Sequence, residues 1–551
     1  MTQSKRQTFL QGALILVCAN ALVKIIGAVF KIPLANLISE DGMGLFNTSY
    51  TMYTFMFVVA TAGFPTAVSK MVAESLAIGK QREADRIFSV SIILLAIVGV
   101  IGSSALYFGA TGFASWLKND RAYLGIMAIS PAVLCVALMS SFRGYFQGHQ
   151  NMYPTAISEV IEALGKLIIG YILAFVFINK SMELAAAGAV FGVTCGTFLS
   201  FTALLIMYII NKRKRASRPI EKMRTTKQIA KELITIAVPI TIGASVASLT
   251  NVIDMMTVMN RLQSIKSVTE GFVVKYNSLI DYSVFNGEIY QKLANQLYGL
   301  YSGYAVPLFN MPLTIVVALS MSVVPAIAGA IARGDKTTAR TTSESAIRIT
   351  LLFAIPCAIG MSILAGPVLL LLFKSSLAGS LLEKLAIAII FVSLLSVTSA
   401  ILQAYGKMNI PVINMFIGGV IKVIINYHLV AIPSINIEGA PIGTLVCYFA
   451  IVSMNFFWII RITGAKFGIV DFFVKPLASA GAMAVAVIFL FNSMISMGIG
   501  VKLATLPAIA FGGLIYLLMI LLVGAIKQED IEMLPRGKKF AIMLRKAHLL
   551  K

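Results

Sequence analysis

Long apolar runs separated by short polar segments follow one another along this 551-residue chain. A helix rises about 1.5 Å per residue, so ~20 apolar residues are enough to cross the ~30 Å hydrocarbon core of a bilayer. Fourteen runs reach that length, and each is predicted to be a transmembrane helix. They lie near residues 9–35, 45–72, 87–110, 121–142, 155–178, 184–210, 230–259, 297–330, 345–373, 382–405, 411–432, 438–461, 476–496 and 503–526. The pattern therefore predicts an all-α polytopic membrane protein.

The composition excludes a soluble globular protein. Hydrophobic residues make up 58% of the chain and charged residues only 12%, so the apolar surface is too large for a soluble core to cover. The net charge of +22 would also suit a nucleic-acid-binding protein. However, the Lys and Arg residues fall between the apolar runs, as expected for cytoplasmic loops that contact anionic lipid. An even number of spans with both termini in the cytoplasm fits this distribution.

The most polar long segment between spans, residues 211–231, divides the first twelve spans into two sets of six. The stretch GFPTAVSKMVAESLAIGK (63–80) is echoed by VVPAIAGAIARGDK (323–336), which indicates an internal repeat. Because each half has an even number of spans, both keep the same orientation, which predicts a parallel pseudo-repeat around a central cavity. The predicted parts are a first lobe (1–210), a basic linker (211–231), a second lobe (232–462), an appended helix pair (463–526) and a basic cytoplasmic tail (527–551).

Two lysines lie inside the first apolar run, LQGALILVCANALVKIIGAVFKIPLANL (10–37). An unpaired ammonium group at membrane depth costs a few kcal/mol, and Lys24 and Lys31 are spaced i, i+7, nearly on one helix face. We therefore expect both to point into a polar cavity that attracts anions. The alternatives are that Lys31 only extends to the headgroups and that Lys24 pairs with Asp254 of the seventh span. Asp254 could also bind a cation.

The fifth span carries three charged residues in SEVIEALGKL (158–167). Glu159, Glu162 and Lys166 share one helix face, and Glu162 stands four residues before Lys166, the favourable order for an ion pair. We expect the pair to neutralise itself in part, either within a substrate site or as a structural ion cluster near the cytoplasmic end.

The eighth span is interrupted by several Gly and Pro residues, including Gly299 and Pro312, and carries Asn310. The corresponding first-half element, residues 42–65, is Gly-rich at its outer end and carries Asn47. Irregular backbone at membrane depth must face protein or a watery cavity, so both elements are predicted to line the cavity. A hinge or tight-packing role is the alternative.

Nothing in the sequence favours a membrane-embedded enzyme. The three histidines lie in different segments without metal-ligand spacing, and no Gly-rich phosphate loop is present. Catalysis needs a nucleophile, acid or base in a defined constellation, and none is recognisable. We therefore expect a transporter, without catalytic residues, a metal or a cofactor.

Three stretches carry a family resemblance: FRGYFQGHQNMYPTAISEVIEALGKL (142–167), LYGLYSGYAVPLFNMP (297–312) and SVVPAIAGAIARGD (322–335). They resemble the stage V sporulation protein B and MurJ-like lipid-linked oligosaccharide flippases of the multidrug/oligosaccharidyl-lipid/polysaccharide (MOP) superfamily. The resemblance implies two six-helix lobes, a terminal helix pair and alternating access. In MurJ-like members, basic residues of the first helix face the cavity. Lys24 matches the first such position, and Lys31 matches the second with a one-residue shift.

The resemblance also implies a substrate. It points to export of an undecaprenyl-pyrophosphate-linked oligosaccharide, such as the peptidoglycan precursor lipid II, across the bacterial cytoplasmic membrane. Roles in peptidoglycan or polysaccharide synthesis, cell shape and sporulation follow from it. A cation-coupled drug antiporter of the same superfamily is the alternative, but two lysines in a cavity favour an anion. The membrane potential or a monovalent cation is the expected energy source, and a monomer is the expected transport unit.

Overall fold

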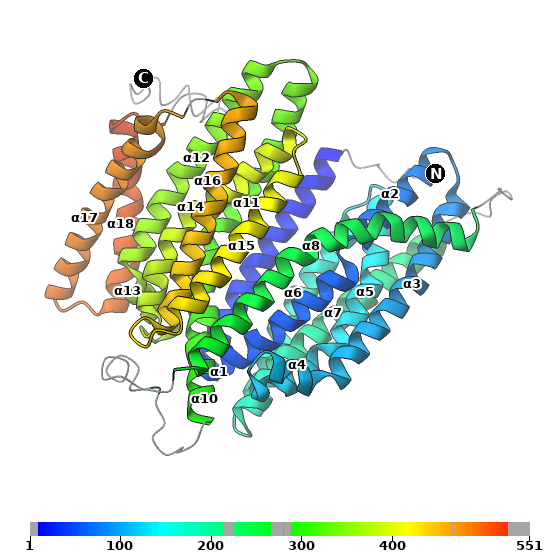
Figure 1. Ribbon diagram of the computed structural model, residues 1–551, viewed down its shortest axis with the longest axis horizontal. Coiled ribbons are helices and arrows are strands. Elements are labelled where there is room, and N and C mark those ends of the chain that lie inside the picture. Colours follow the sequence, from blue (N-terminus) through cyan, green and yellow to red (C-terminus); the bar gives the residue numbers. More distant parts are fainter. Residues whose placement is uncertain (1–8, 214–223, 266–278, 280–287, 466, 527–551) are drawn as a thin grey trace. The chain divides into compact units, whose positions relative to one another are not determined.

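The computed structural model describes residues 9–213, 224–265, 279, 288–465 and 467–526, and in these residues the regular structure is helical throughout (Figure 1). The predicted tail (527–551) and residues 214–223 of the predicted basic linker lie outside the described residues. Thirteen of the described helical segments are long and apolar enough to cross a membrane. The first of them, Cys18–Ala77, is broken at Ser39, so counting its two halves separately gives the predicted fourteen spans. The all-α polytopic fold is confirmed.

The chain forms two compact units, with unit 1 comprising Met1–Ser264 and Ser278–Gly299 and unit 2 comprising Ile265–Asn277 and Leu300–Lys551. Unit 1 contains α1 (Phe9–Thr61), α2 (Phe64–Ala77), α3 (Gln81–Phe108), α4 (Ala110–Trp116), a short 3-10 helix (Asp120–Ala122), α5 (Tyr123–Gly148), α6 (Tyr153–Phe177), α7 (Met182–Arg213), α8 (Thr226–Gln263) and α10 (Glu288–Gly299). Its core is built from apolar faces of α2, α3, α5, α7 and α8, with Phe88, Phe142 and Tyr145 at its centre.

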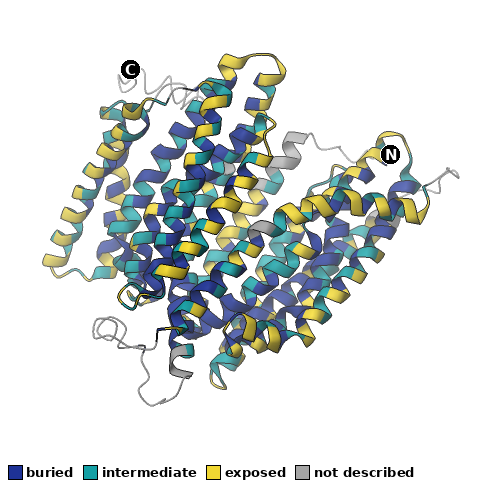
Figure 2. Ribbon diagram, viewed as in Figure 1, coloured by how far each residue is buried: buried dark blue, intermediate teal, exposed yellow. Residues whose placement is uncertain are grey.

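Unit 2 contains the remaining described helices. They are the π-helical turn η3 (Leu300–Ala305), α11 (Val306–Ala332), α12 (Lys336–Ile363), α13 (Ala365–Phe373), α14 (Gly379–Ala404), α15 (Asn409–Leu429), a 3-10 helix (Asn436–Glu438), α16 (Gly439–Thr463), a second π-helical turn (Val470–Val474), α17 (Lys475–Ser496) and α18 (Val501–Leu522). The appended pair α17–α18 packs on α12 and α13, and the Tyr516 hydroxyl donates to the backbone oxygen of Leu352 at 2.7 Å. Figure 2 shows α17 and α18 largely exposed or intermediate, whereas α12 and α14 of the same unit carry many buried positions.

The break at Ser39 folds α1 back on itself. Ser39 has φ 53° and ψ −172°, a backbone conformation that non-glycine residues rarely adopt. In a straight helix, Phe30 and Phe46 would lie about 24 Å apart along the axis, yet their ring centroids are 5.9 Å apart. The two halves of α1 are therefore separate spans whose side chains meet near the bend, and the sequence predicts separate spans for the first two apolar runs.

The packing divides the chain later than the predicted linker does, because α8 and α10 lie in unit 1. At the start of α2, the Gly63 amide donates to Thr241 Oγ1 of α8 at 3.0 Å. α10 docks on α1 in the same close manner, since the Asn295 amide donates to Asp41 Oδ1 at 2.7 Å. A polar linker marks where the chain leaves the membrane, whereas the packing partner of the next helix depends on side-chain contacts that the linker does not encode.

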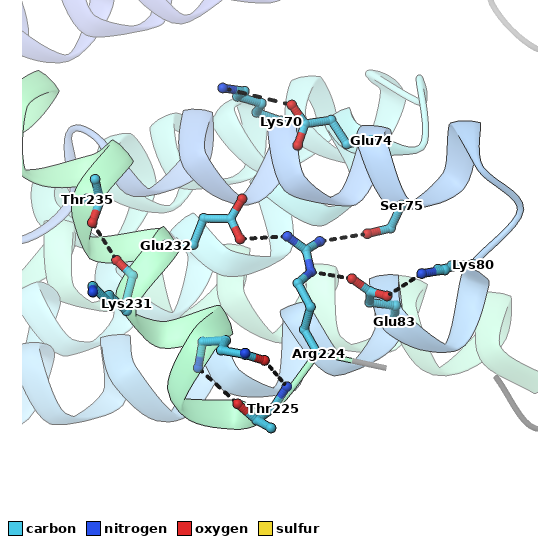
Figure 3. Close-up of polar contacts among 11 residues, drawn as sticks. Lys70, Glu74, Ser75, Lys80, Glu83, Arg224, Thr225, Lys231, Glu232 and Thr235 are labelled. Carbon is cyan, nitrogen blue, oxygen red and sulfur yellow. Dashed lines mark hydrogen bonds and ion pairs between the residues drawn. The ribbon is translucent and has the colours of Figure 1, made fainter. Parts of the chain in front are cut away.

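Arg224, just before α8, joins three helices of unit 1 (Figure 3). Its guanidinium donates to Glu83 of α3, to Glu232 Oε2 of α8 at 2.6 Å and to Ser75 Oγ of α2 at 3.3 Å. Glu83 is only 2% exposed, and Lys80 Nζ lies 3.7 Å from its second oxygen. A buried carboxylate of this kind needs its cationic partners, so Arg224 fixes the start of α8 to α2 and α3.

Gly63→Ala is expected to lower the free energy of unfolding by about 1–3 kcal/mol through overpacking. A Cβ at Gly63 would lie 2.1 Å from the carbonyl oxygen of Ala237, so α8 must shift. Gly27→Ala is the matched control, because an added Cβ there meets nothing within 4 Å. Thermal unfolding of both variants in detergent checks this, and equal Tm values would contradict the close packing of α8 on α2.

Arg224→Ala is expected to cost about 2 kcal/mol, because it removes a hydrogen bond from the buried carboxylate of Glu83. The control is Lys70→Ala, which breaks an ion pair with Glu74 whose side chains are 58% and 53% exposed, and such pairs contribute at most about 1 kcal/mol. Denaturation midpoints of the purified variants give the comparison. A Lys70→Ala loss as large as that of Arg224→Ala would show that the Arg224 contacts add little.

Candidate functional site

The side chain of Lys166 lies in an aromatic cage within unit 1. Its Nζ is 4.3 Å from the ring centroid of Tyr50, 5.3 Å from that of Phe30 and 5.8 Å from that of Phe46. Phe30 and Phe46 are buried, and Lys166 and Tyr50 are half-buried. Aromatic faces attract cations by roughly 0.5–2 kcal/mol. Within the described parts of the chain, Lys166 has no hydrogen bond or ion pair, so its closest stabilising groups are the rings, while the Glu162 carboxylate attracts it without contact.

The fold of α1 builds this cage. Phe30 comes from the half before the Ser39 break, and Phe46 and Tyr50 come from the half after it. Phe46 and Tyr50 stack with ring centroids 5.8 Å apart, as expected for residues one helical turn apart. α6 packs against α1 and supplies Lys166.

Lys31 lies beside this cage. It follows Phe30 in sequence, is half-buried, and lies close enough to Lys166 for the two ammonium groups to repel each other. Like Lys166, it forms no ion pair or hydrogen bond with the residues that the structure describes. We call Lys31, Lys166, Phe30, Phe46 and Tyr50 the lysine–aromatic cluster. Lys31 of the first predicted span thus lies near a second cation, Lys166 of the fifth predicted span.

Glu162 and Lys166 do not form the ion pair that their spacing favours, although the Glu162 carboxylate still attracts the Lys166 ammonium group. Glu162 Oε2 instead accepts a hydrogen bond from Arg143 Nη2 of α5 at 2.9 Å. Arg143 also donates through Nε to Ser158 Oγ at 3.0 Å. The sequence places Arg143 in a loop after the fourth apolar run, whereas it lies within α5. In the sequence, Arg143 stands directly after this apolar run, and that position is the one feature that could have drawn attention to it.

Glu159 lies one turn before Glu162 on α6. Its Oε2 atom is buried and has no hydrogen-bond partner among the described residues. Arg143 attracts this carboxylate and Glu162 repels it. The structure therefore brings Glu159, Glu162 and Arg143 together, one helical turn or more from Lys166.

The other predicted site residues differ in their surroundings. Lys24 is exposed and makes no ion pair with any described residue, so no pair with Asp254 is formed, while Asp254 is buried in α8. The Asn47 amide donates to the Met43 carbonyl of its own helix at 2.9 Å. Asn310 is exposed on α11 of unit 2. The interrupted eighth span begins with a π-helical turn, an irregularity often found at functional positions.

The arrangement favours binding of an anion. Lys31 and Lys166 bring two positive charges close together without a carboxylate partner in the described structure. Removal from water strengthens the attraction between such charges and a multivalent anion. No group of three or more potential metal ligands occurs in the described parts of the chain.

Known proteins resemble this chain along most of its length. The family model described as polysaccharide biosynthesis protein matches residues 9–330, and that described as lipid II flippase MurJ matches residues 298–508. Stage V sporulation protein B of Bacillus subtilis (strain 168) is 25% identical over 535 residues, covering 96% of this chain and 98% of the relative. Lipid II flippase MurJ of the same organism is 27% identical over 492 residues, covering 84% of each chain. A solved structure of lipid II flippase MurJ in an inward closed conformation has a TM-score of 0.68 at 16% identity, covering 92% of this chain and 98% of that one.

Proposed function

This chain belongs to the polysaccharide biosynthesis protein family, and we propose that it exports an undecaprenyl-pyrophosphate-linked oligosaccharide across the bacterial cytoplasmic membrane by alternating access. It is a multi-pass membrane transporter of the MOP superfamily rather than an enzyme. The peptidoglycan precursor lipid II is the substrate that the names of its relatives favour. A relative named for sporulation supports a role in the cell wall of a growing or a sporulating cell.

The observation that carries the proposal is the lysine–aromatic cluster. A pyrophosphate bears about two or more negative charges, and a Lys ammonium group is a compact partner for it. Lys31 and Lys166 supply two such groups, and neither forms an ion pair with a described carboxylate. A cationic drug would be repelled by this pair, and a neutral drug would gain no ionic attraction from it.

A cation-coupled drug antiporter is the second candidate. The buried, unpartnered Oε2 of Glu159 favours it, because an antiporter needs a carboxylate that exchanges a cation or proton. In the proposed flippase, the same carboxylate or the membrane potential would couple transport to an energy source. Depletion of the protein separates the two functions: accumulation of lipid-linked precursors on the inner leaflet supports the flippase, and loss of drug efflux without accumulation supports the antiporter.

Lys31→Ala and Lys166→Ala are each expected to reduce export of the lipid-linked precursor by about 10- to 100-fold. One charge-assisted contact contributes about 1.5–3 kcal/mol, which corresponds to this range. The matched control is Lys180→Ala, because Lys180 lies 5.4 Å from the Phe177 ring centroid but is exposed at a helix end. Transport into proteoliposomes, corrected for protein content, provides the measurement. Unchanged export in both cluster variants would refute the proposed anion site.

Lys24→Ala is expected to lose transport, because it removes a positive charge of the first span. Its abundance in the membrane should stay unchanged, because Lys24 is exposed and its removal leaves no described carboxylate without an ion-pair partner. Lys24→Arg should keep much of the activity, since charge matters more here than the shape of the donor group. Complementation and membrane levels are compared with those of Lys24→Ala/Asp254→Ala. If the double variant regained the function that Lys24→Ala lost, Lys24 would be a structural partner of Asp254.

A further inference from the structure

Glu162 is positioned on α6 so that it could neutralise part of the positive charge of the proposed anion site. It precedes Lys166 by four residues on α6, the spacing and order at which a carboxylate and an ammonium group form an ion pair. Such a pair would remove one of the two positive charges of the lysine–aromatic cluster. The structure avoids this, because Glu162 is turned to Arg143 on the neighbouring helix.

Arg143 is held firmly in the position that engages Glu162. Its side chain is 16% exposed and contacts α6 at two points, Glu162 and Ser158. Ser158 is itself fixed, because its hydroxyl donates to the Thr155 carbonyl at 2.7 Å and its carbonyl accepts from Ser200 Oγ of α7 at 2.8 Å. Arg143 therefore bridges α5 to a part of α6 that α7 also holds.

The charges around Arg143 make its role specific. On α6 it faces Glu159 and Glu162, and it attracts both carboxylates. On α1, Tyr50 and Tyr53 face Glu162 with neutral rings. Without Arg143, the nearest cation that Glu162 could reach on its own helix is Lys166.

We propose that Arg143 is a positioning residue that holds Glu162 away from Lys166 and so keeps the Lys166 charge available to an anionic ligand. This inference rests on the proposed function, in which that ligand is the pyrophosphate group of a lipid-linked substrate. Arg143 acts through Glu162 and does not contact the ligand. Lys166 itself is held by its contacts with the rings of Phe30, Phe46 and Tyr50.

The test measures binding of inorganic pyrophosphate to the purified full-length protein by titration calorimetry. Arg143→Gln is expected to weaken the Kd by about 10-fold or more, because Glu162 then pairs with Lys166. Arg143→Lys and Glu162→Gln should each stay within about threefold of the native Kd. The decisive variant is Arg143→Gln/Glu162→Gln, in which no carboxylate at 162 can neutralise Lys166, so the Kd should return to within about threefold of the native value. A double variant as weak as Arg143→Gln would overturn the proposal.

The control for a general loss of packing is Arg121→Gln. Arg121 joins Asp41 of α1 at 2.8 Å and Glu183 of α7 at 2.7 Å, a comparable pair between helices that excludes the cluster residues. Its loss should lower Tm and leave the Kd of the folded protein unchanged. An Arg121→Gln Kd as weak as that of Arg143→Gln would contradict a role for Arg143 beyond packing.

A second readout is independent of any ligand. With Arg143 present, the Tm changes of Glu162→Gln and Lys166→Met should nearly add, because the two side chains form no ion pair and Glu162 attracts Lys166 only without contact. In the Arg143→Gln background they should stop adding, because the pair has formed. Additivity in both backgrounds would overturn the positioning role even if pyrophosphate binds. Non-additivity only without Arg143, in a protein that fails to bind pyrophosphate, would sustain the positioning role and refute the proposed anionic substrate.

Discussion

A charge within the hydrocarbon layer needs a partner, and this constraint organises unit 1. Removing an ion from water costs several kcal/mol, so a membrane protein keeps a buried charge only where another group stabilises it. Arg143 and Glu162 stabilise each other as an ion pair, and Arg121 joins Asp41 and Glu183 in the same way. Lys166 departs from this pattern, because aromatic rings take the place of a carboxylate. In the proposed function, this exception marks the position at which the fold retains a charge for a ligand.

The packing of the helices supplies the stabilising groups. The rings of the cage come from both halves of α1, so they meet only because the backbone reverses at Ser39. Arg143 reaches Glu162 only because α5 and α6 are neighbours in unit 1. The stabilisation of Lys166 and of Glu162 therefore depends on contacts between segments that the fold brings together. A strained residue at Ser39 is maintained because the surrounding helices fix both halves of α1.

The sequence predicts the spans well because length and apolarity alone decide whether a helix can cross a membrane. It also places Lys31, Glu162 and Lys166 on faces that the structure brings together. It misassigns the partner of Glu162, because the i, i+4 rule considers one helix and cannot see Arg143 approaching from another. The place of α8 in unit 1 is missed for a similar reason. Close contacts such as that between Gly63 and Ala237 decide the packing, whereas the polar linker only marks a loop.

The aromatic cage has a consequence for a protein that must both bind and release its substrate. A carboxylate next to Lys166 would compete with an anionic ligand, and separating a buried ion pair costs about 3–5 kcal/mol. Aromatic rings attract the ammonium group by only about 0.5–2 kcal/mol and remain in place when it turns to a ligand. In the proposed transport cycle, the rings stabilise the ammonium group in the protein interior when no substrate is bound. They compete only weakly with an anionic substrate for that group. The pairing of Arg143 with Glu162 and the caging of Lys166 are thus two parts of one arrangement, in which the nearby carboxylate is occupied and the cation is held weakly.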